Sequence, residues 1–270
     1  MKLLFLGGGN MAYALIGGLL KTGLSAGDIH VVDPVAEVRL RLQAQFGVAC
    51  FACAEETAET PDVVLLAVKP QQMQGALAPW RSRLGDSLVI SIAAGIDLAT
   101  LSRWLDGHQR LVRVMPNTPA LVGAGISGCC ATPAVDAAAR ALTDRLLQSV
   151  GATLWVADEK HIDAVTAISG SGPAYVFLFI EALQHAAQEL GLTPEQGRQL
   201  ALATVQGAGA LAAASDESVS VLRERVTSKG GTTAAALEVM RAREVPQGII
   251  AGCHAAAARS EELGRLLGAV

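Results

Sequence analysis

The chain has few charged and few aromatic side chains, and its basic residues do not cluster. Charged residues make up 17% and aromatic residues 4% of the 270 positions, and 21 Lys and Arg against 25 Asp and Glu leave a formal net charge of −4. Proteins that grip a nucleic-acid backbone need a patch of Lys and Arg. We therefore expect no nucleic-acid partner. The 51% of apolar residues also excludes a largely disordered chain.

Cysteine is scarce and unevenly spaced. The five cysteines are odd in number, as expected of reduced cytoplasmic thiols and not of a disulfide framework. Cys50 and Cys53 form a single C-x-x-C with no second pair and no nearby histidine. We interpret them as small buried side chains in preference to a redox or zinc site, and we expect no metal.

Long apolar runs are also missing. Lys2 and the four apolar residues after it imitate the start of a secretory signal, but the run breaks at Gly7. No later window reaches the roughly 18 uninterrupted apolar residues of a membrane-spanning helix. We expect a soluble, cytoplasmic protein that does not enter a membrane.

The first half of the chain alternates short apolar runs with helical patterns. Strand patterns lie at residues 3–6, 29–32, 63–68, 88–92 and 111–115, and several of them are continuous apolar runs, as is typical of parallel strands buried on both faces. Helical patterns at 11–21, 36–46, 71–84 and 98–105 lie between them. This alternation predicts an α/β Rossmann domain with a doubly wound, mainly parallel sheet.

The second half shows helical patterns only, at residues 160–168, 173–190, 194–214, 219–226, 233–241 and 246–267. Pro173, Pro194 and Pro246 stand where first helical turns begin. Alanine-rich, weakly charged helices often hide surface against another subunit, so we expect an oligomer. We place the Rossmann domain at residues 1–157 and an all-α domain at 158–270.

A glycine-rich turn follows the first predicted strand. Gly7 permits a tight turn, Gly9 lets the backbone approach a pyrophosphate, and Ala12 allows close helix–strand packing. The free amides and positive dipole end of the next helix suit phosphates. We therefore predict a dinucleotide site in the G-x-G-x-x-A segment formed by Gly7, Gly8, Gly9, Asn10, Met11 and Ala12.

Asp33 ends the second predicted strand. A carboxylate there typically accepts hydrogen bonds from the adenosine ribose and repels a 2′-phosphate, which favours NADH. Arg39 and Arg41 lie a turn or more farther along the chain. The alternative is that Asp33 only begins a turn with Pro34.

Further cofactor candidates follow three other predicted strands, at the edge where open α/β sheets bind ligands. Pro70 ends its strand and aims Lys69 at the crevice, with a plain surface lysine as the alternative. Two alanines leave room for a nicotinamide ring, and an asparagine in a proline-bounded loop can donate into the site. These candidates are Ala67, Val68, Lys69, Pro70, Ala93, Ala94 and Asn117.

Two glycine-bearing segments lie in the helical half. We interpret residues 169–175 as a close helix crossing, with Ser171 facing the crevice as the alternative. Residues 227–233, with the sequence TSKGGTT, separate two predicted helices. Free amides in such a loop can hold a carboxylate without an arginine, and Thr233 adds a hydroxyl at the helix start. A plain helix cap is the alternative.

Together these segments resemble the pyrroline-5-carboxylate reductases, which catalyse the last step of proline biosynthesis. The resemblance covers nearly the whole chain, in residues 7–12, 67–70, 115–119, 169–175 and 226–233 followed by Leu237. The last segment is the most specific, because other Rossmann reductases lack a Ser-x-Gly-Gly-x-Thr loop there.

The resemblance implies hydride transfer from NADPH or NADH to the imine carbon of (S)-1-pyrroline-5-carboxylate, giving L-proline. It implies that Ser228, Gly230, Gly231 and Thr232 bind the substrate, with the N–H groups of Ser228, Gly231 and Thr232 on the carboxylate, and that Thr233 contacts the ring nitrogen. It also implies a homodimer with interlocked helical domains, each loop over the partner's cofactor, and in some members a higher oligomer.

Two positions depart from the family pattern. Members often carry Ser, Asn or Arg just after the second strand to grip the NADPH phosphate, where this chain has Asp33 and Pro34. An asparagine that touches the adenosine end in some members aligns with Ala54. Because of these two departures, both NADPH and NADH are kept as candidate cofactors.

Two other functions are weighed against this one. A β-hydroxyacid dehydrogenase shares the plan of a Rossmann domain followed by helices, but Lys160 is the only lysine near the position of its catalytic lysine. A non-catalytic redox sensor would bind the dinucleotide and would have no need of the loop at 228–233.

Overall fold

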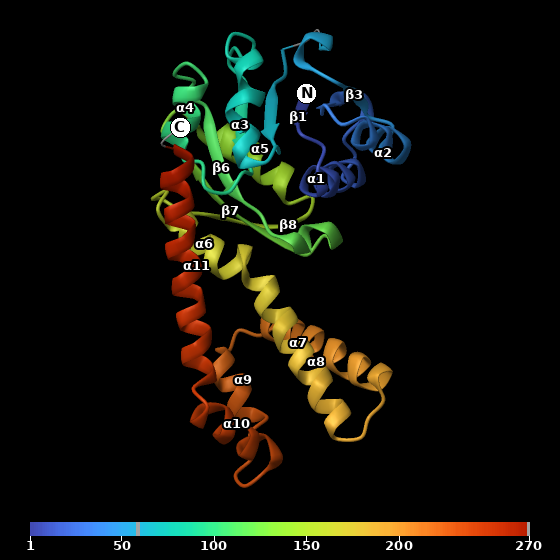
Figure 1. Ribbon diagram of the computed structural model, residues 1–270, viewed down its shortest axis with the longest axis vertical. Helices are drawn as coiled ribbons and strands as arrows, with labels where there is room; N and C mark the ends of the chain where they lie inside the picture. Colours follow the sequence, from blue (N-terminus) through green and yellow to red (C-terminus); the bar gives the residue numbers. More distant parts are fainter. Residues whose placement is uncertain (58–59, 269–270) are drawn as a thin grey trace. The chain divides into compact units, whose positions relative to one another are not determined.

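The computed structural model describes residues 1–57 and 60–268 and contains two compact units. One consists of Met1–Ser171 together with the chain from Ala256 onward, and the other of Gly172–Ala255 (Figure 1). The domain boundary expected between residues 157 and 158 stays a prediction. The first unit extends beyond it because Ile162 is buried in the core of the sheet domain and Ser260 donates a hydrogen bond to Asp163 at 2.6 Å.

The first unit is built on a sheet of eight strands among the described residues, in the order β3-β2-β1-β4-β5-β6-β7-β8. Every neighbouring pair is parallel except β6 and β7. The predicted doubly wound, mainly parallel sheet is therefore confirmed. The strands are β1 (Leu3–Leu6), β2 (Ile29–Val32), β3 (Ala49–Phe51), β4 (Val63–Leu66), β5 (Leu88–Ser91), β6 (Leu111–Met115), β7 (Gly125–Ala131) and β8 (Gly151–Trp155).

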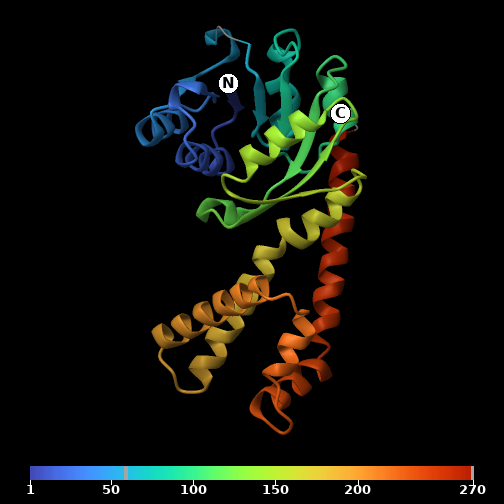
Figure 2. The same ribbon diagram turned by 180° about the vertical axis from the view of Figure 1, so that it is seen from behind.

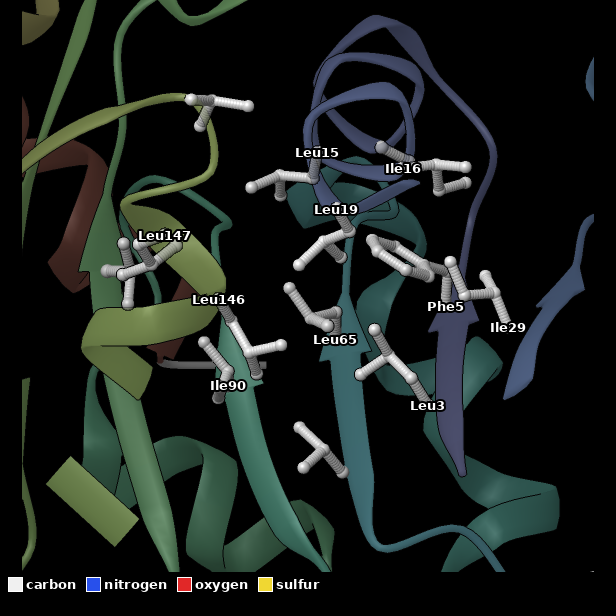
Figure 3. Close-up of a cluster of buried hydrophobic side chains, with 14 of the residues drawn as sticks. Leu3, Phe5, Leu15, Ile16, Leu19, Ile29, Leu65, Ile90, Leu146 and Leu147 are labelled. Atoms are coloured by element: carbon white, nitrogen blue, oxygen red, sulfur yellow. The ribbon is translucent and has the colours of Figure 1, made fainter. Parts of the chain in front are cut away.

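Both faces of the sheet are buried at β1, β4 and β5, which explains their continuous apolar runs. In β1, Leu3 and Phe5 pack into one hydrophobic cluster with Leu15 of α1, Asn10–Lys21 (Figure 3). Leu4 packs into a second cluster with Met73 of α3, Pro70–Leu77. Each fully buried Leu or Phe contributes about 1.5–3 kcal/mol to stability. The helices of this unit are α1 (Asn10–Lys21), α2 (Ala36–Phe46), α3 (Pro70–Leu77), α4 (Leu98–Trp104), α5 (Ala137–Leu147) and α6 (His161–Val165).

Several elements differ from the sequence-based expectation. The strands β3, β7 and β8 and the helix α5, which crosses the sheet in Figure 2, were not predicted. The helix expected at 71–84 was wrong at its end, since α3 stops at Leu77 and Pro79 falls in a 3₁₀ turn, Ala78–Trp80. The helix expected at 160–168 ends at Val165 and continues as a π-helical turn, Thr166–Gly170.

The second unit is all-helical, as predicted. It contains α7 (Gly172–Glu189), α8 (Pro194–Ala214), α9 (Val219–Arg225), α10 (Thr232–Ala242) and the first part of α11 (Val245–Gly268). A capping box of Thr193 and Gln196 begins α8. Gly197 lets α7 and α8 approach closely, because a Cβ there would lie 3.0 Å from the Cβ of Ala187.

The helix α7 leaves its apolar side chains uncovered. Phe177 is 59% and Phe179 49% exposed, and α7 has no buried residue. Among the described residues, the helical run His161–Glu189 is long and apolar enough to cross a membrane. Length and composition alone are weak evidence of a membrane-spanning segment. Such an apolar surface marks a contact with a partner.

Candidate active site

A cavity of about 650 Å³ lies at the carboxyl edge of the sheet, where doubly wound folds bind ligands. The β1–α1 turn, the end of β2, the segment after β3 and the β4–α3 turn all contribute to its wall. The predicted cofactor residues among its lining are Gly7, Gly9, Asp33, Ala67, Val68 and Lys69. The fold thus brings together residues that lie far apart in the sequence, from Gly7 to Lys69.

The glycine turn has the geometry that a dinucleotide pyrophosphate requires. Gly7 adopts a φ of +95° and donates its N–H to the carbonyl of Val32 at 2.8 Å. No atom lies within 4 Å of a Cβ built on Gly9, and Ala12 is fully buried. Gly9 caps α1 without a side-chain hydrogen bond, so the first-turn amides have no partner inside the helix. The turn therefore fits a dinucleotide phosphate group.

The carboxylate of Asp33 is buried and held by two backbone amides. Its Oδ2 accepts a hydrogen bond from Gly8 N–H at 2.8 Å and its Oδ1 one from Val35 N–H at 2.9 Å. The second bond makes Asp33 the start of a turn, as the alternative interpretation expected. Whether the carboxylate also binds ribose stays a prediction.

Two arginines that were not predicted as site residues, Arg39 and Arg41, donate hydrogen bonds to the backbone beside Asp33 and Gly8. Arg39 donates to the carbonyl of Asp33 at 2.7 Å, and Arg41 donates to the carbonyl of Gly8 at 3.1 Å. The sequence holds one signal for this, because both arginines lie on the helix that follows the Asp33 turn. The contact of Arg41 with the glycine loop, 33 residues away, depends on how α2 packs on β1 and β2.

The β4–α3 turn carries Lys69 at the rim of the cavity. Lys69 is exposed and immediately precedes Pro70, the first residue of α3. Trp80, which sequence reasoning missed, is 2% exposed and also lines the cavity. The guanidinium of Arg83 lies over its ring at 5.0 Å and donates to the carbonyls of Ala54 and Thr57. The contact between Arg83 and Trp80 supports the part of the cavity wall that is most distant in sequence from the glycine turn.

Eight of the fourteen predicted cofactor residues do not line this cavity: Gly8, Asn10, Met11, Ala12, Pro70, Ala93, Ala94 and Asn117. Ala93 and Ala94 follow β5, whose Ser91 pairs with Leu66 of β4, so they stand at the same edge of the sheet. Asn117 is 8% exposed; its Nδ2 donates to Ser169 O at 3.1 Å and its Oδ1 accepts from Ile126 N–H at 2.9 Å. A direct contact of Asn117 with the cofactor stays a prediction that these internal bonds do not support.

The loop before α10 offers amides that no side chain caps. Gly230 has a φ of +73°, and Gly231 donates its N–H to Ser228 O at 3.0 Å. Gly231 is the N-cap of α10, which begins at Thr232, and no side chain accepts from the first turn. The cap interpretation of Thr233 thus finds no support. An anion can be held by the free amides of this first turn.

The cysteines differ from each other in exposure. Cys129 is buried, and burial raises the pKa of its thiol to about 12. Cys53 is exposed and lines the cavity, so the expectation that it is buried was wrong. All five thiols are free, and over residues 1–57 and 60–268 no three His, Cys, Asp or Glu side chains gather as a metal site.

A second cavity of about 620 Å³ lies elsewhere in the same unit, against the end of α11. Arg113 in its wall is 6% exposed and pairs with Glu159 at 2.9 Å. Its wall contains none of the glycine-turn residues. The predicted dinucleotide-binding residues therefore gather at the first cavity and not at the second.

Two family models match the chain. Residues 159–263 match the model described as pyrroline-5-carboxylate reductase dimerisation, and residues 2–95 match NADP oxidoreductase coenzyme F420-dependent. The first match indicates that the helical half of this chain forms an oligomer.

Curated relatives and solved structures agree with these matches. A pyrroline-5-carboxylate reductase from Pseudomonas aeruginosa is 43% identical over 99% of this chain and 98% of its own length, and one from Haemophilus influenzae is 44% identical over 97% of both. The structure of a pyrroline-5-carboxylate reductase from Coxiella burnetii has a TM-score of 0.92 and 38% identity, over 97% of this chain and 98% of that one. That of a Plasmodium falciparum pyrroline carboxylate reductase with NADP bound has a TM-score of 0.87 and 30% identity, over 98% of both chains.

Proposed function

The chain belongs to the pyrroline-5-carboxylate reductases, and on this basis we propose that it reduces (S)-1-pyrroline-5-carboxylate to L-proline with NADPH or NADH. The observation that carries the proposal is the uncapped glycine loop at the start of α10, whose first-turn amides can hold a carboxylate. Family membership decides against a β-hydroxyacid dehydrogenase.

The dinucleotide is held by the first cavity. When bound, the reduced nicotinamide supplies the hydride for the reaction. The amides of Asn10, Met11 and Ala12 receive the pyrophosphate, and the walls at Ala67 and Lys69 border the rest of the molecule. The small side chains of Ala93 and Ala94 leave space at the sheet edge.

The substrate is held by its carboxylate and its ring nitrogen. The N–H groups of Ser228 and Thr232 donate to the carboxylate, beside Gly230, whose positive φ shapes the loop. The N–H of Gly231 joins them when it leaves the carbonyl of Ser228, to which it donates in this structure. The hydroxyl of Thr233 holds the ring nitrogen. A protonated imine is already a good hydride acceptor, so the residues of the chain act by orienting it and excluding water.

The complete site contains residues of two copies of the chain. The support is the match of residues 159–263 to a dimerisation model and the exposed apolar surface of α7. In this arrangement the helical domains of a homodimer interlock and place the loop of one subunit over the cofactor of the other, and dimers associate further. The apolar run at residues 161–189 then contacts protein and not lipid, as expected of a soluble enzyme in the cytoplasm.

The experiment that tests this function is a reduction assay with pyrroline-5-carboxylate and each cofactor in turn. The expected result is oxidation of one equivalent of cofactor for each L-proline formed. A protein that binds the dinucleotide but forms no proline would be the redox sensor instead.

A further inference from the structure

The second cavity, of about 620 Å³, lies wholly within the first unit. Its wall is formed by the segment after β5, the start of α4, β6, the region of α6 and the last turns of α11, which lie against α4 (Figure 1). The wall contains equal numbers of basic and acidic side chains. A ligand with a single charge is attracted by half of these groups and repelled by the other half, so the wall favours a ligand that carries both charges.

Arg113 and Glu159 form an ion pair on the sheet side of this cavity. Nη1 of Arg113 lies 2.9 Å from Oε1 of Glu159, and Nη2 lies 4.0 Å from Oδ1 of Asp163. The same two oxygens accept a second hydrogen bond, from Leu98 N–H and from the Ser260 hydroxyl. The pair is therefore fixed in place, and the other oxygen of each carboxylate accepts no hydrogen bond from residues 1–57 and 60–268.

The guanidinium of Arg113 also has a donor without a partner. Arg113 is 6% exposed, and its Nε is buried and makes no hydrogen bond to the described residues. Buried donors in folded proteins are nearly always paired. An unpaired guanidinium donor in a cavity wall indicates an acceptor that comes from outside the chain, and a carboxylate is the acceptor that suits an arginine best.

Glu261 and Arg265 supply a second pair of charges, from α11. They stand four positions apart and therefore share one face of the helix, and both line the cavity. Side chains of opposite charge at this spacing commonly bind each other. Here neither makes a hydrogen bond or an ion pair within the described part of the chain, so both groups are available to a ligand.

The other charged side chains of the wall have less to offer, because they already make hydrogen bonds or ion pairs. Their partners are Thr100 for Asp97, Gly268 for Arg103 and Asp158 for Lys160. The cavity thus presents one basic and one acidic group from the sheet side and one of each from α11.

We propose that the second cavity binds a free α-amino acid as its zwitterion, with the carboxylate between Arg113 and Arg265 and the ammonium between Glu159 and Glu261. In such a molecule the nitrogen and the nearer carboxylate oxygen lie roughly 3 Å apart, as the bond lengths require. This separation is close to the 2.9 Å between Arg113 and Glu159, so the two charges of the ligand can pair with both side chains at once. The site is separate from the proposed reductase site and does not depend on it.

Calorimetric titration of the intact protein with L-proline at neutral pH tests the proposal. Cyclopentanecarboxylate is present in excess, because it has the ring and the carboxylate of proline but no nitrogen. It can therefore occupy the carboxylate loop before α10, while it offers no ammonium to the second cavity. Pyrrolidine, which has the ring and the positive charge alone, is titrated separately.

The test variant carries Glu261→Gln and Arg265→Gln, two exposed positions where the amide leaves the helix intact. The matched control carries Arg259→Gln and Glu262→Gln. These two residues form an ion pair at 2.6 Å on the same helix, with side chains 57% and 51% exposed, and neither lines the cavity.

Wild type should bind L-proline in the presence of excess cyclopentanecarboxylate and should bind pyrrolidine at least tenfold more weakly. The test variant should lose about tenfold or more in proline affinity, as the loss of two charge-assisted contacts predicts. The control variant should match wild type. Both variants should reduce pyrroline-5-carboxylate with the kcat of wild type.

Equal proline affinity in wild type and the test variant would overturn the proposal. So would abolition of proline binding by cyclopentanecarboxylate, or pyrrolidine binding as tight as that of proline, since either result shows a site for a single charge. A kcat that falls in parallel with proline affinity would assign the cavity to the active site and overturn it too. Absence of reductase activity in wild type would contradict the proposed function alone.

Discussion

A methyl group at Gly7 would lie 2.7 Å from the carbonyl oxygen of Ala67. The glycine turn after β1 and the end of β4 are therefore in direct backbone contact, and Gly7 also adopts a φ of +95°. Two constraints, a close approach and a left-handed backbone, fall on one residue at the bottom of the dinucleotide cavity.

Gly7→Ala should lower both stability and dinucleotide affinity. Gly23→Ala is the control, because Gly23 has the same φ of +95° but no atom within 4 Å of its Cβ position. Both variants carry the backbone strain, while only Gly7→Ala carries the clash, which should cost about 1–3 kcal/mol more. Urea unfolding and NADPH titration of the two proteins measure the difference. Equal losses would show that the contact with Ala67 is unimportant.

Thr233→Val should slow turnover roughly 10- to 100-fold, because the hydroxyl that holds the ring nitrogen is lost while the side-chain shape is kept. Thr232→Val is the matched control, since the proposed role of Thr232 uses its backbone amide. Steady-state kinetics with pyrroline-5-carboxylate compare the two. Wild-type kinetics in Thr233→Val would remove its hydroxyl from the mechanism.

Stability should fall at alkaline pH in part because of Cys129. Burial raises the pKa of this thiol to about 12, above its ordinary value, so the folded state keeps the proton that the unfolded chain loses. This contribution is complete below the unfolded pKa, about 8.5, and declines by about 1.4 kcal/mol per pH unit up to the folded pKa. Urea unfolding of wild type and Cys129→Ala from pH 8 to 10 should show a steeper loss in wild type. Parallel curves would contradict the assignment.

The uncovered apolar side chains of α7 should hold subunits together. Light scattering should give at least twice the chain mass of 27.8 kDa for wild type. Replacing Phe177 and Phe179 with Asp should reduce the assembly, since charges are excluded from the apolar centre of an interface. Leu40→Asp is the control, because Leu40 is 65% exposed on α2 in the other unit. A monomeric wild type would refute the oligomer.

Local pattern predicted the parts of the site that depend on neighbouring residues. The run from Leu3 into Gly7 and Gly9 predicted a strand, a turn and a helix, and the structure contains all three. By contrast, β7 contains Gly125, Ser127 and Gly128, whose low strand propensity hid a strand that the neighbouring β6 and β8 stabilise.

Contacts between residues distant in the sequence could not be predicted from local sequence patterns. Asn117 looked free to donate into the site, but its amide bonds to Ser169, 52 positions away. Arg41 looked remote from the glycine turn and is bonded to it, 33 positions away. Side-chain partners at such separations follow from the packing of helices on the sheet, which a single sequence does not encode locally.

Complementation between two impaired variants tests most directly the claim that one active site joins the glycine turn of one subunit to the loop of another. Gly7→Ala disables the dinucleotide turn and Thr233→Val the substrate loop. In a mixed dimer, a shared site pairs the intact turn of one chain with the intact loop of the other. Co-expressed variants should therefore form proline faster than the average of the two variants measured separately. Activity no higher than the average of the separate variants, in dimers shown to be mixed, would contradict the shared site.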